Sequence, residues 1–486
     1  MEGHSGAGEG DTPRELKPEV PAEEEQEVFM PENEGEVVAD LEGQLSDDDE
    51  DEELEDLSEQ DGQGLENEDA DMMAEDVEEE FAVERDDACA SLDTGNAETG
   101  TASRPVYSVK WNKAEASIAA CGGEDDLVRL WKPFHTSGPN SVVLAGHEDT
   151  IVALDFDASG KLLASGGMDG RVCIWSTMTG NKLCTLEGPG EAVEFVKWHP
   201  LGSVVLAGSE DFTMWMWNID TRPLGDGTVA SLNHQCMQVF TGHNKSVTCG
   251  GFTPNGKAIV STSLDGTVKV WNPKTGECLY TYNTAPEASM WDSNPEAAAE
   301  VDNGITCLDF SPDSSMVLCG GIDCTAHLLN INTCKVLWKM GQATQSSTQV
   351  MGQAAGASHH EDSIESVSFH PSGHPLVATA SLDGSMIVWD VNTMTPRVVC
   401  KHPRGVIRVL WAQKGTNSSP DQLVHDLCLY TCCLDGRVRL WDARSGKCER
   451  EFQGFTKAVL DMDATPDGRY ILAGSDDGTA RVFTVQ

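Results

Sequence analysis

Four sets of His, Ser or Thr, Asp and Trp recur along the chain at nearly constant spacing. In the first set, His147 is followed by Ser165, Asp169 and Trp175. A His between a hydroxyl group and a carboxylate is the combination that activates a Ser nucleophile for acyl transfer. A single set of this kind would favour a hydrolase.

The repetition of the set argues against catalysis. The other three sets are His243, Ser261, Asp265 and Trp271; His360, Thr379, Asp383 and Trp389; and His402, Thr431, Asp435 and Trp441. The His and the hydroxyl residue also occur together or not at all. A buried network with one partner missing costs more than an apolar one. We therefore predict a structural hydrogen-bonded chain of indole, hydroxyl, imidazole and carboxylate.

These sets belong to a longer repeat in which an Asp precedes a bulky apolar residue by six positions. The eight pairs are Asp125/Trp131, Asp169/Trp175, Asp211/Trp217, Asp265/Trp271, Asp323/Leu329, Asp383/Trp389, Asp435/Trp441 and Asp477/Phe483. Successive Asp residues are 44, 42, 54, 58, 60, 52 and 42 positions apart, a spacing typical of four-stranded propeller blades. Apolar runs bounded by Gly, Asp, Asn and Pro indicate strands and turns. We predict an all-β fold with one closed propeller of eight blades, and seven blades as the alternative.

The charge of the chain changes sharply near residue 100. Residues 1–100 hold 39 Asp and Glu against 3 Lys and Arg, whereas the rest of the chain holds 42 against 29. Such a like-charged segment cannot offset the entropy lost on folding. We predict a disordered acidic tail over residues 1–93 and the propeller over residues 94–486. Ser46, which precedes four acidic residues, is a candidate phosphorylation site.

The last repeat ends too close to Gln486 to supply an outer strand. An unpaired sheet edge is a liability, so we predict that residues 94–105 provide the missing strand of blade 8. The eight repeats then occupy residues 103–486.

The chain carries no motif for chemistry. We find no phosphate-binding Gly-rich loop, no paired Cys-x-x-Cys and no His-Glu-x-x-His, and we predict no enzyme activity, no cofactor and no metal. The 16 Cys residues fall mostly on strand-like runs, as core residues do in a reducing compartment. Neither a signal peptide nor a long apolar run is evident. We expect a cytoplasmic monomer, with the nucleus as a second compartment.

Acidic residues gather in the Asp turns and in the connections between blades, which share one face of a propeller. The candidates for partner binding are Glu124, Asp126, Glu148, Asp149, Glu210, Asp302, Glu361, Asp362 and Asp476. An acidic face attracts a basic protein and repels nucleic acid phosphates. We predict a basic protein partner and no binding to nucleic acid or membranes, with plain solvated loops as the alternative. Trp215 and Trp291 are candidate aromatic anchors, although packing is the favoured role for Trp215.

These repeats and tetrads resemble those of the WD40 family. Residues 193–218, the GGEDD at 122–126 and residues 429–448 are, in addition, similar to the angio-associated migratory cell protein family. Fungal relatives in that family are chaperones of a basic ribosomal protein of the large subunit. The resemblance therefore implies a non-enzymatic chaperone that captures such a protein during ribosome assembly.

The alternative function is a scaffold in signalling or cell migration, or a substrate receptor of a ubiquitin ligase. Ligase receptors of this fold dock through Trp-Asp-x-Arg motifs in adjacent blades. Only Trp441 to Arg444 fits that pattern here, which is weak support.

Overall fold

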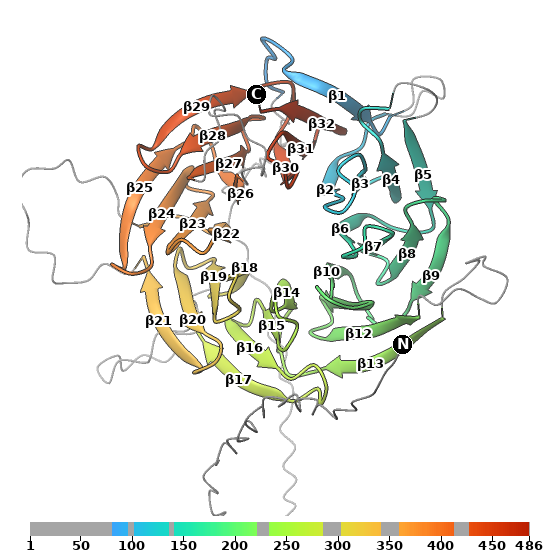
Figure 1. Ribbon diagram of the computed structural model, residues 1–486, viewed down its shortest axis with the longest axis vertical. Helices are drawn as coiled ribbons and strands as arrows, with labels where there is room; N and C mark the ends of the chain where they lie inside the picture. Colours follow the sequence, from blue (N-terminus) through green and yellow to red (C-terminus); the bar gives the residue numbers. More distant parts are fainter. Residues whose placement is uncertain are drawn as a thin grey trace, which may run out of the picture. The chain divides into compact units, whose positions relative to one another are not determined.

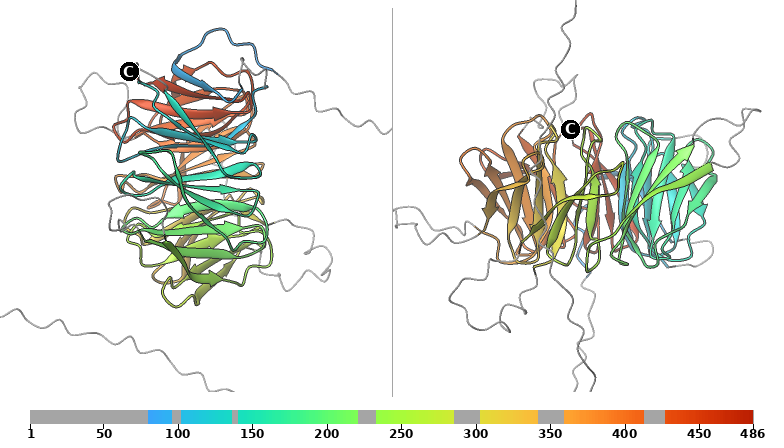
Figure 2. Two further views of the ribbon diagram at one scale, coloured as in Figure 1. Left: turned by 90° about the vertical axis from the view of Figure 1, so that its right-hand side faces the viewer. Right: turned by 90° about the horizontal axis from the view of Figure 1, so that it is seen from below.

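The computed structural model describes residues 80–95, 102–135, 140–220, 233–284, 303–341, 359–412 and 427–485. The described strands form eight four-stranded antiparallel sheets arranged as a ring around a central channel (Figure 1). Seen from the side, the strands of each sheet run through the thickness of the ring (Figure 2). The predicted all-β fold with eight blades is confirmed.

Each blade contains four strands that follow one another from the channel to the outside. Blade 1 contains β2 (Val106–Trp111), β3 (Ala119–Gly123), β4 (Leu127–Trp131) and β5 (Ser141–Ala145); blade 2 contains β6 (Ile151–Phe156), β7 (Leu162–Gly167), β8 (Val172–Ser176) and β9 (Lys182–Leu186); blade 3 contains β10 (Val193–Trp198), β11 (Val204–Ser209), β12 (Met214–Asp220) and β13 (Asn233–Phe240); blade 4 contains β14 (Cys249–Phe252), β15 (Ile259–Thr262), β16 (Thr267–Trp271) and β17 (Cys278–Asn283). Blade 5 contains β18 (Ile305–Phe310), β19 (Met316–Gly321), β20 (Ala326–Asn330) and β21 (Lys335–Met340); blade 6 contains β22 (Ile364–Phe369), β23 (Leu376–Ser381), β24 (Ser385–Asp390) and β25 (Thr395–Lys401); blade 7 contains β26 (Val406–Trp411), β27 (Cys428–Cys433), β28 (Val438–Asp442) and β29 (Lys447–Phe452); blade 8 contains β30 (Val459–Ala464), β31 (Tyr470–Ser475), β32 (Thr479–Thr484) and β1 (Ala88–Asp93).

The hydrophobic core lies between neighbouring blades. Every residue of β7, β23 and β27 is buried, because the second strand of a blade has a blade on either side. In one cluster, Val172 and Ile174 of blade 2 pack with Val196 and Ala207 of blade 3. Since each cluster joins two blades, the closed ring buries apolar side chains that a single blade would leave exposed.

The strand that completes blade 8 is β1, and the prediction that residues 94–105 would form it was wrong. β1 pairs antiparallel with β32, from Asp93 opposite Thr479 to Ala88 opposite Phe483, and Figure 1 shows β1 lying along the outer side of β32. Residues 80–95 are described as part of the ring, so the predicted tail boundary at residue 93 was also too late. The run ACASLD carries few β-branched residues, which hid the strand from pattern reading.

Two carboxylates close the ring a second time on the channel side. Asp461 and Asp463 of β30 accept hydrogen bonds from the backbone N–H groups of Val109 and Trp111 of β2, both at 2.9 Å. These bonds tie blade 8 to blade 1 at the inner strands, while β1 completes blade 8 at its outer edge.

Candidate functional site

Three of the four tetrads form the predicted chain of hydrogen bonds. In blade 2, Trp175 Nε1 donates to Ser165 Oγ at 2.8 Å, Ser165 Oγ lies 2.7 Å from His147 Nε2, and His147 Nδ1 lies 3.0 Å from Asp169. The same chain joins His243, Ser261, Asp265 and Trp271 in blade 4, and His360, Thr379, Asp383 and Trp389 in blade 6. Each hydroxyl oxygen is thereby held between an indole and an imidazole.

The geometry of these tetrads suits bracing rather than acyl transfer. Ser165, Ser261 and Thr379 are fully buried, so no substrate can approach their hydroxyl oxygens. Asp169 also accepts the backbone N–H groups of Glu148 and Arg171, both at 3.0 Å. Each carboxylate therefore fixes the turn that carries it to the preceding loop of the same face.

The tetrad environment raises the pKa of His147. Burial lowers this pKa, but the hydrogen bonds to Asp169 and Cys173 and the charges of these two groups together outweigh burial and raise the pKa to about 9. Burial raises the pKa of Asp169, but the hydrogen bond and charge of His147 together with the backbone N–H groups of Glu148 and Arg171 outweigh burial, so this pKa falls below its ordinary value. The pair is therefore an imidazolium and a carboxylate at neutral pH.

The fourth set, in blade 7, departs from the prediction. Trp441 and His402 still bond Thr431, at 2.9 and 2.8 Å. His402 Nδ1, however, faces the carbonyl oxygen of Gly384 at 3.3 Å instead of Asp435. The Asp435 carboxylate is paired with Arg439 at 2.5 Å, so the tetrad ends at the imidazole.

Several acidic candidates on the turn face are already neutralised by neighbouring cations. Glu124 pairs with Arg104 at 2.8 Å, Glu148 pairs with Arg171 at 2.8 Å, and Asp476 lies 3.9 Å from Lys457. No sequence pattern signals these pairs, since each joins two separate loops. These three residues are weaker candidates for partner binding than the pattern suggested.

The remaining described candidates keep an uncompensated negative charge on the turn face. Asp149 and Asp362 accept backbone N–H groups of their own turns, both at 2.7 Å. Glu361 is exposed. Burial, followed by the nearby Asp149 carboxylate, raises the pKa of Asp126. Asp302, Trp291 and Ser46 lie outside the described residues.

A pair of carboxyl groups in blade 3 was missed by the sequence reading. Burial of Glu194, on β10, and its side-chain hydrogen bond with Glu210 raise the pKa of Glu194 to about 7. Among the described residues, no Lys or Arg lies within ion-pair distance of either group. Glu194 lines the channel and Glu210 is exposed in the turn, so the pair marks the channel mouth. The apolar setting of Glu194 in VEFVKW carried no signal for this pair.

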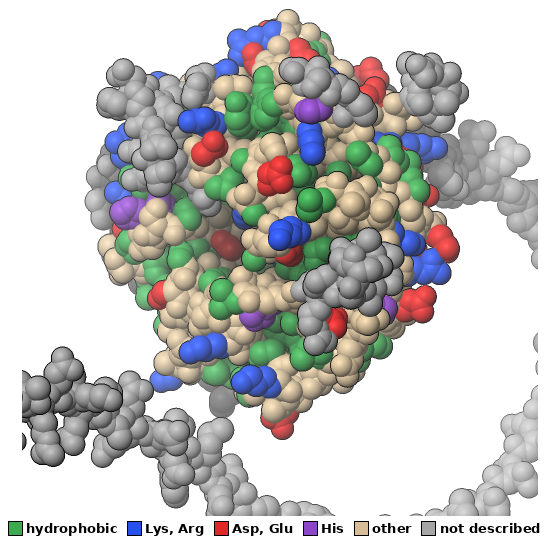
Figure 3. Space-filling view, turned by 45° about the vertical axis from the view of Figure 1, so that its right-hand side comes forward, with side chains coloured by type: hydrophobic (Ala, Val, Ile, Leu, Met, Phe, Trp, Pro, Cys, Tyr) green, Lys and Arg blue, Asp and Glu red, His purple; other side chains and the backbone are tan. Residues whose placement is uncertain are grey.

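The aromatic candidate Trp215 has a packing role. Its ring stacks on Trp217 with centroids 6.1 Å apart, and its Nε1 donates to Thr213 Oγ1 at 2.8 Å. On the surface drawn in Figure 3, acidic and basic side chains are interspersed rather than gathered in one continuous patch. The surface in this view therefore shows no single acidic patch.

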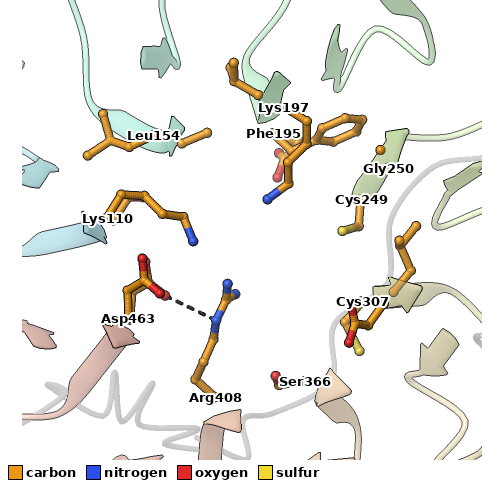
Figure 4. Close-up of a pocket in the computed structure, with 18 of the residues that line it drawn as sticks. Lys110, Leu154, Phe195, Lys197, Cys249, Gly250, Cys307, Ser366, Arg408 and Asp463 are labelled. Carbon is orange, nitrogen blue, oxygen red and sulfur yellow. Dashed lines mark ion pairs between the residues drawn. The ribbon is translucent and has the colours of Figure 1, made fainter. Parts of the chain in front are cut away.

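The central channel encloses about 550 Å³ and is lined by both cationic and acidic side chains. Lys110, Lys197 and Arg408 point their head groups into it (Figure 4). Arg408 Nε lies 3.3 Å from Asp461 Oδ1. Burial lowers the pKa of Lys110, and the charges of Lys197 and Arg408 lower it further against the opposing effect of Asp463. The carboxyl groups of Asp309, Glu365 and Asp463 line the same channel, so its cations do not make it a positively charged site.

Two further features bear on the class of site. Within the described residues, no group of three or more His, Cys, Asp and Glu side chains could hold a metal ion. In the same part of the chain, no helix has the length and apolar character needed to cross a bilayer.

Comparison with known proteins agrees with this architecture. The pattern described as "WD domain, G-beta repeat" matches residues 96–132, 138–176, 180–218, 234–272, 299–330, 355–390, 398–442 and 446–484. The chain belongs to the WD40 family. Members of this family typically act as scaffolds for protein interaction, and no catalytic family is indicated.

Two relatives within this WD40 family cover most of the chain. Human angio-associated migratory cell protein is 32% identical over 384 residues, which are 79% of this chain and 78% of the relative. The ribosome assembly protein SQT1 of Saccharomyces cerevisiae is 24% identical over 76% of this chain and 81% of its own length.

Solved structures of WD40 propellers support the fold. The Chaetomium thermophilum Sqt1 structure, bound to the N-terminus of ribosomal protein L10, superposes with a TM-score of 0.65 at 22% identity, covering 82% of this chain and all of that chain. The Saccharomyces cerevisiae Sqt1 structure gives a TM-score of 0.65 at 19% identity, over 82% of this chain and 99% of that one. At this identity the likeness concerns the fold alone.

Proposed function

We propose that this WD40 protein is a non-enzymatic chaperone that binds a basic ribosomal protein of the large subunit during ribosome assembly. The observation that carries the proposal is the carboxyl pair of Glu194 and Glu210, which faces the channel mouth without a compensating cation. A partner that supplies Lys or Arg there gains a charge-assisted contact. The cytoplasm, with the nucleus as a second compartment, is the setting that fits such a role.

Relatives support the choice of partner. Sqt1 of Chaetomium thermophilum has been solved with the N-terminus of ribosomal protein L10, and the yeast relative is a ribosome assembly protein. The N-terminal segment of L10 is therefore the first ligand to test on this chain. We expect one monomeric propeller to bind one such segment.

The test combines unbiased capture with direct binding. Crosslinked affinity purification from lysate in about 100 mM salt, a condition in which charge contacts are only partly screened, should return one dominant basic ribosomal protein. Calorimetric titration of the L10 N-terminal peptide should give an affinity that falls as salt rises. Reversal of Glu191, Glu210 and Glu361 to Lys should abolish this binding.

A matched control uses acidic residues on the opposite face. Glu115 and Glu277 lie in loops at the other end of the strands, and their reversal to Lys changes net charge without touching the turn face. Equal loss of binding in both variants would point to a general charge effect. Capture of ligase adaptors or signalling proteins instead of a ribosomal protein would favour the scaffold function. Arg444 of the ligase-like motif already braces its own strand end through Asp442 at 3.0 Å.

A further inference from the structure

In all eight blades, the residue after the turn Asp has a left-handed backbone conformation with positive φ. Five blades place Gly there: Gly170, Gly266, Gly384, Gly436 and Gly478, with φ from 72° to 80°. The other three blades place Asp126, Phe212 and Cys324 in the same conformation, at 62°, 70° and 62°. A side chain in this region is unfavourable, and a bulky one is a marked outlier.

The Phe212 side chain does not offset this backbone strain by packing into the core of the propeller. Its side chain is 45% exposed, and it belongs to none of the apolar clusters formed by the described residues. The turn is held by other groups. Asp211 accepts the N–H groups of Thr213 and Gly190, at 3.0 and 2.8 Å, and Asp211 N donates to Ser209 Oγ at 3.1 Å.

The turn that carries Phe212 has acidic neighbours. Glu210 precedes it by two positions and forms the carboxyl pair with Glu194. The turn also bonds the loop before β10, through Glu210 N to Ala192 O at 2.9 Å and Ser209 Oγ to Glu191 O at 3.2 Å. Glu191 is exposed in that loop. Among the described residues, no cation forms an ion pair with Glu191, Glu194 or Glu210.

A strained, exposed aromatic ring among unpaired carboxylates fits recognition of a cation. Strain of this kind persists where it serves a site, and an aromatic face attracts a guanidinium or ammonium group. Aromatic residues at the centre of a charged surface are also frequent binding hot spots. An Arg or Lys that stacked on Phe212 would place its charge beside Glu210 and Glu191.

We infer that Phe212 is an aromatic anchor for a basic partner, on which an Arg or Lys side chain of the partner stacks while Glu191, Glu194 and Glu210 neutralise its charge. The inference rests on the proposed function, since it names the contact through which the basic protein is bound. It also assigns blade 3 as the centre of the binding face.

The variant Phe212→Gly separates binding from folding. Gly relieves the positive φ, so the melting temperature should stay equal to that of the wild type or rise. The affinity for the L10 N-terminal peptide should fall by about fivefold to tenfold, as expected for loss of a cation–π contact. Phe212→Tyr keeps an aromatic face and should retain the affinity, whereas Phe212→Leu keeps the apolar bulk and should lose it.

Cys324→Gly is the matched control, because it relieves the same backbone strain in blade 5. It should raise the melting temperature in the same way and leave the affinity unchanged. A lower melting temperature of Phe212→Gly would overturn the inference by showing a packing role, as would unchanged affinity of Phe212→Gly and Phe212→Leu. A wild-type protein that binds no basic peptide at any salt concentration would overturn the proposed function and this inference with it.

Discussion

The guanidinium group of Arg439 lies 2.5 Å from the carboxylate of Asp435, where the other tetrads place a His. Arg439 also pairs with Glu451 at 2.9 Å. His402, left with the carbonyl oxygen of Gly384, is buried without an anion. Burial, followed by the Arg439 charge, lowers the pKa of His402 to about 4. Two sets that look alike in sequence therefore hold His in opposite charge states.

This difference predicts how Arg439→Ile changes the titration of His402. Ile387 occupies the matching position of blade 6, so the substitution fits a blade. Without the guanidinium group, the Asp435 carboxylate can face the imidazole, and the pKa of His402 should rise from about 4 to above about 6. Histidine ¹⁵N chemical shifts followed against pH measure it. Arg437→Gln, in the turn just before β28, should leave His402 unchanged, and a His402 pKa that stays near 4 in Arg439→Ile would contradict the assignment.

The stability of the wild type should also depend on His402. Its pKa in the folded state lies below the ordinary value of 6.5, so the unfolded state binds the proton first as pH falls. The stabilising contribution is present above about pH 6.5 and is lost progressively as pH falls toward 4. Urea unfolding at pH 7.5, 6 and 5 measures this loss. Arg439→Ile should flatten that part of the pH dependence, and a parallel decline in both proteins would assign the effect to other groups.

The tetrads predict that removing a hydroxyl group from a complete tetrad and adding one to a blade without a tetrad both lower the free energy of unfolding. Ser261→Ala leaves Trp271 Nε1 and His243 Nε2 without their shared partner, which should cost about 1 to 3 kcal/mol of unfolding free energy. Ala473→Ser places a hydroxyl group among Phe455 and Phe483, where no partner awaits it, and should cost a similar amount. Chemical denaturation of both variants checks the pair of predictions. A neutral Ser261→Ala would show that the tetrad adds nothing to stability.

Truncation tests the position of the closing strand. Removal of residues 1–79 keeps β1 and should leave the melting temperature within about 2 °C of that of the full chain. Removal of residues 1–94 deletes β1, exposes the edge of β32 and should lower the melting temperature while promoting aggregation. Scanning calorimetry and light scattering distinguish the two. Equal behaviour of both truncations would mean that β1 does not close the ring.

The carboxyl pair at the channel mouth predicts that a basic peptide binds more tightly at higher pH. The pKa of Glu194 is raised to about 7, so its charge develops between pH 6 and 8 and the affinity should rise over that range. The effect on the stability of the fold has the opposite sign. Because the pKa of Glu194 is raised in the folded state, its contribution to the free energy of unfolding is fully present below the ordinary pKa of 4.5 and is lost as pH rises through 7. Titration of the L10 peptide into wild type and Glu194→Gln checks the sign for binding, and urea unfolding of both proteins at pH 5 and 8 checks the sign for stability. The affinity of the variant should depend less on pH. The same pH dependence in both proteins would exclude Glu194 as its cause.

Most of the fold could be predicted because the same sequence signal recurs in each of the eight blades. Eight Asp residues with an apolar residue six positions on specify eight turns and eight third strands, and the pairing of His with Ser or Thr identified three networks. The closing strand was placed too late because a single short run with two Ala residues gives no repeated signal. Long-range pairing decided that position instead.

The site was harder to predict because local charge does not reveal its partner. Glu124 looked free, yet Arg104 from the connection before blade 1 pairs with it. Asp435 looked like a tetrad residue, but Arg439, four positions later, pairs with its carboxylate in place of His402. Arg129 pairs with Asp125 at the same spacing, so an Arg four positions after the turn Asp is a sequence signal for this arrangement. Phe212 carried a signal in the sequence, since it stands where most blades have Gly, but only the backbone angle shows what that replacement costs.

The pairing of β1 with β32 has a consequence for synthesis of the chain. β1 is translated well before its partner strand β32, so Ala88 must wait for Phe483 to leave the ribosome before blade 8 is complete. Closing so long a loop is entropically costly and slow compared with formation of a hairpin. Seven blades can form in order during translation, but the ring becomes continuous only after β32 has been synthesised. Until then the nascent protein presents open sheet edges on either side of the gap, and it is itself a candidate for protection by chaperones.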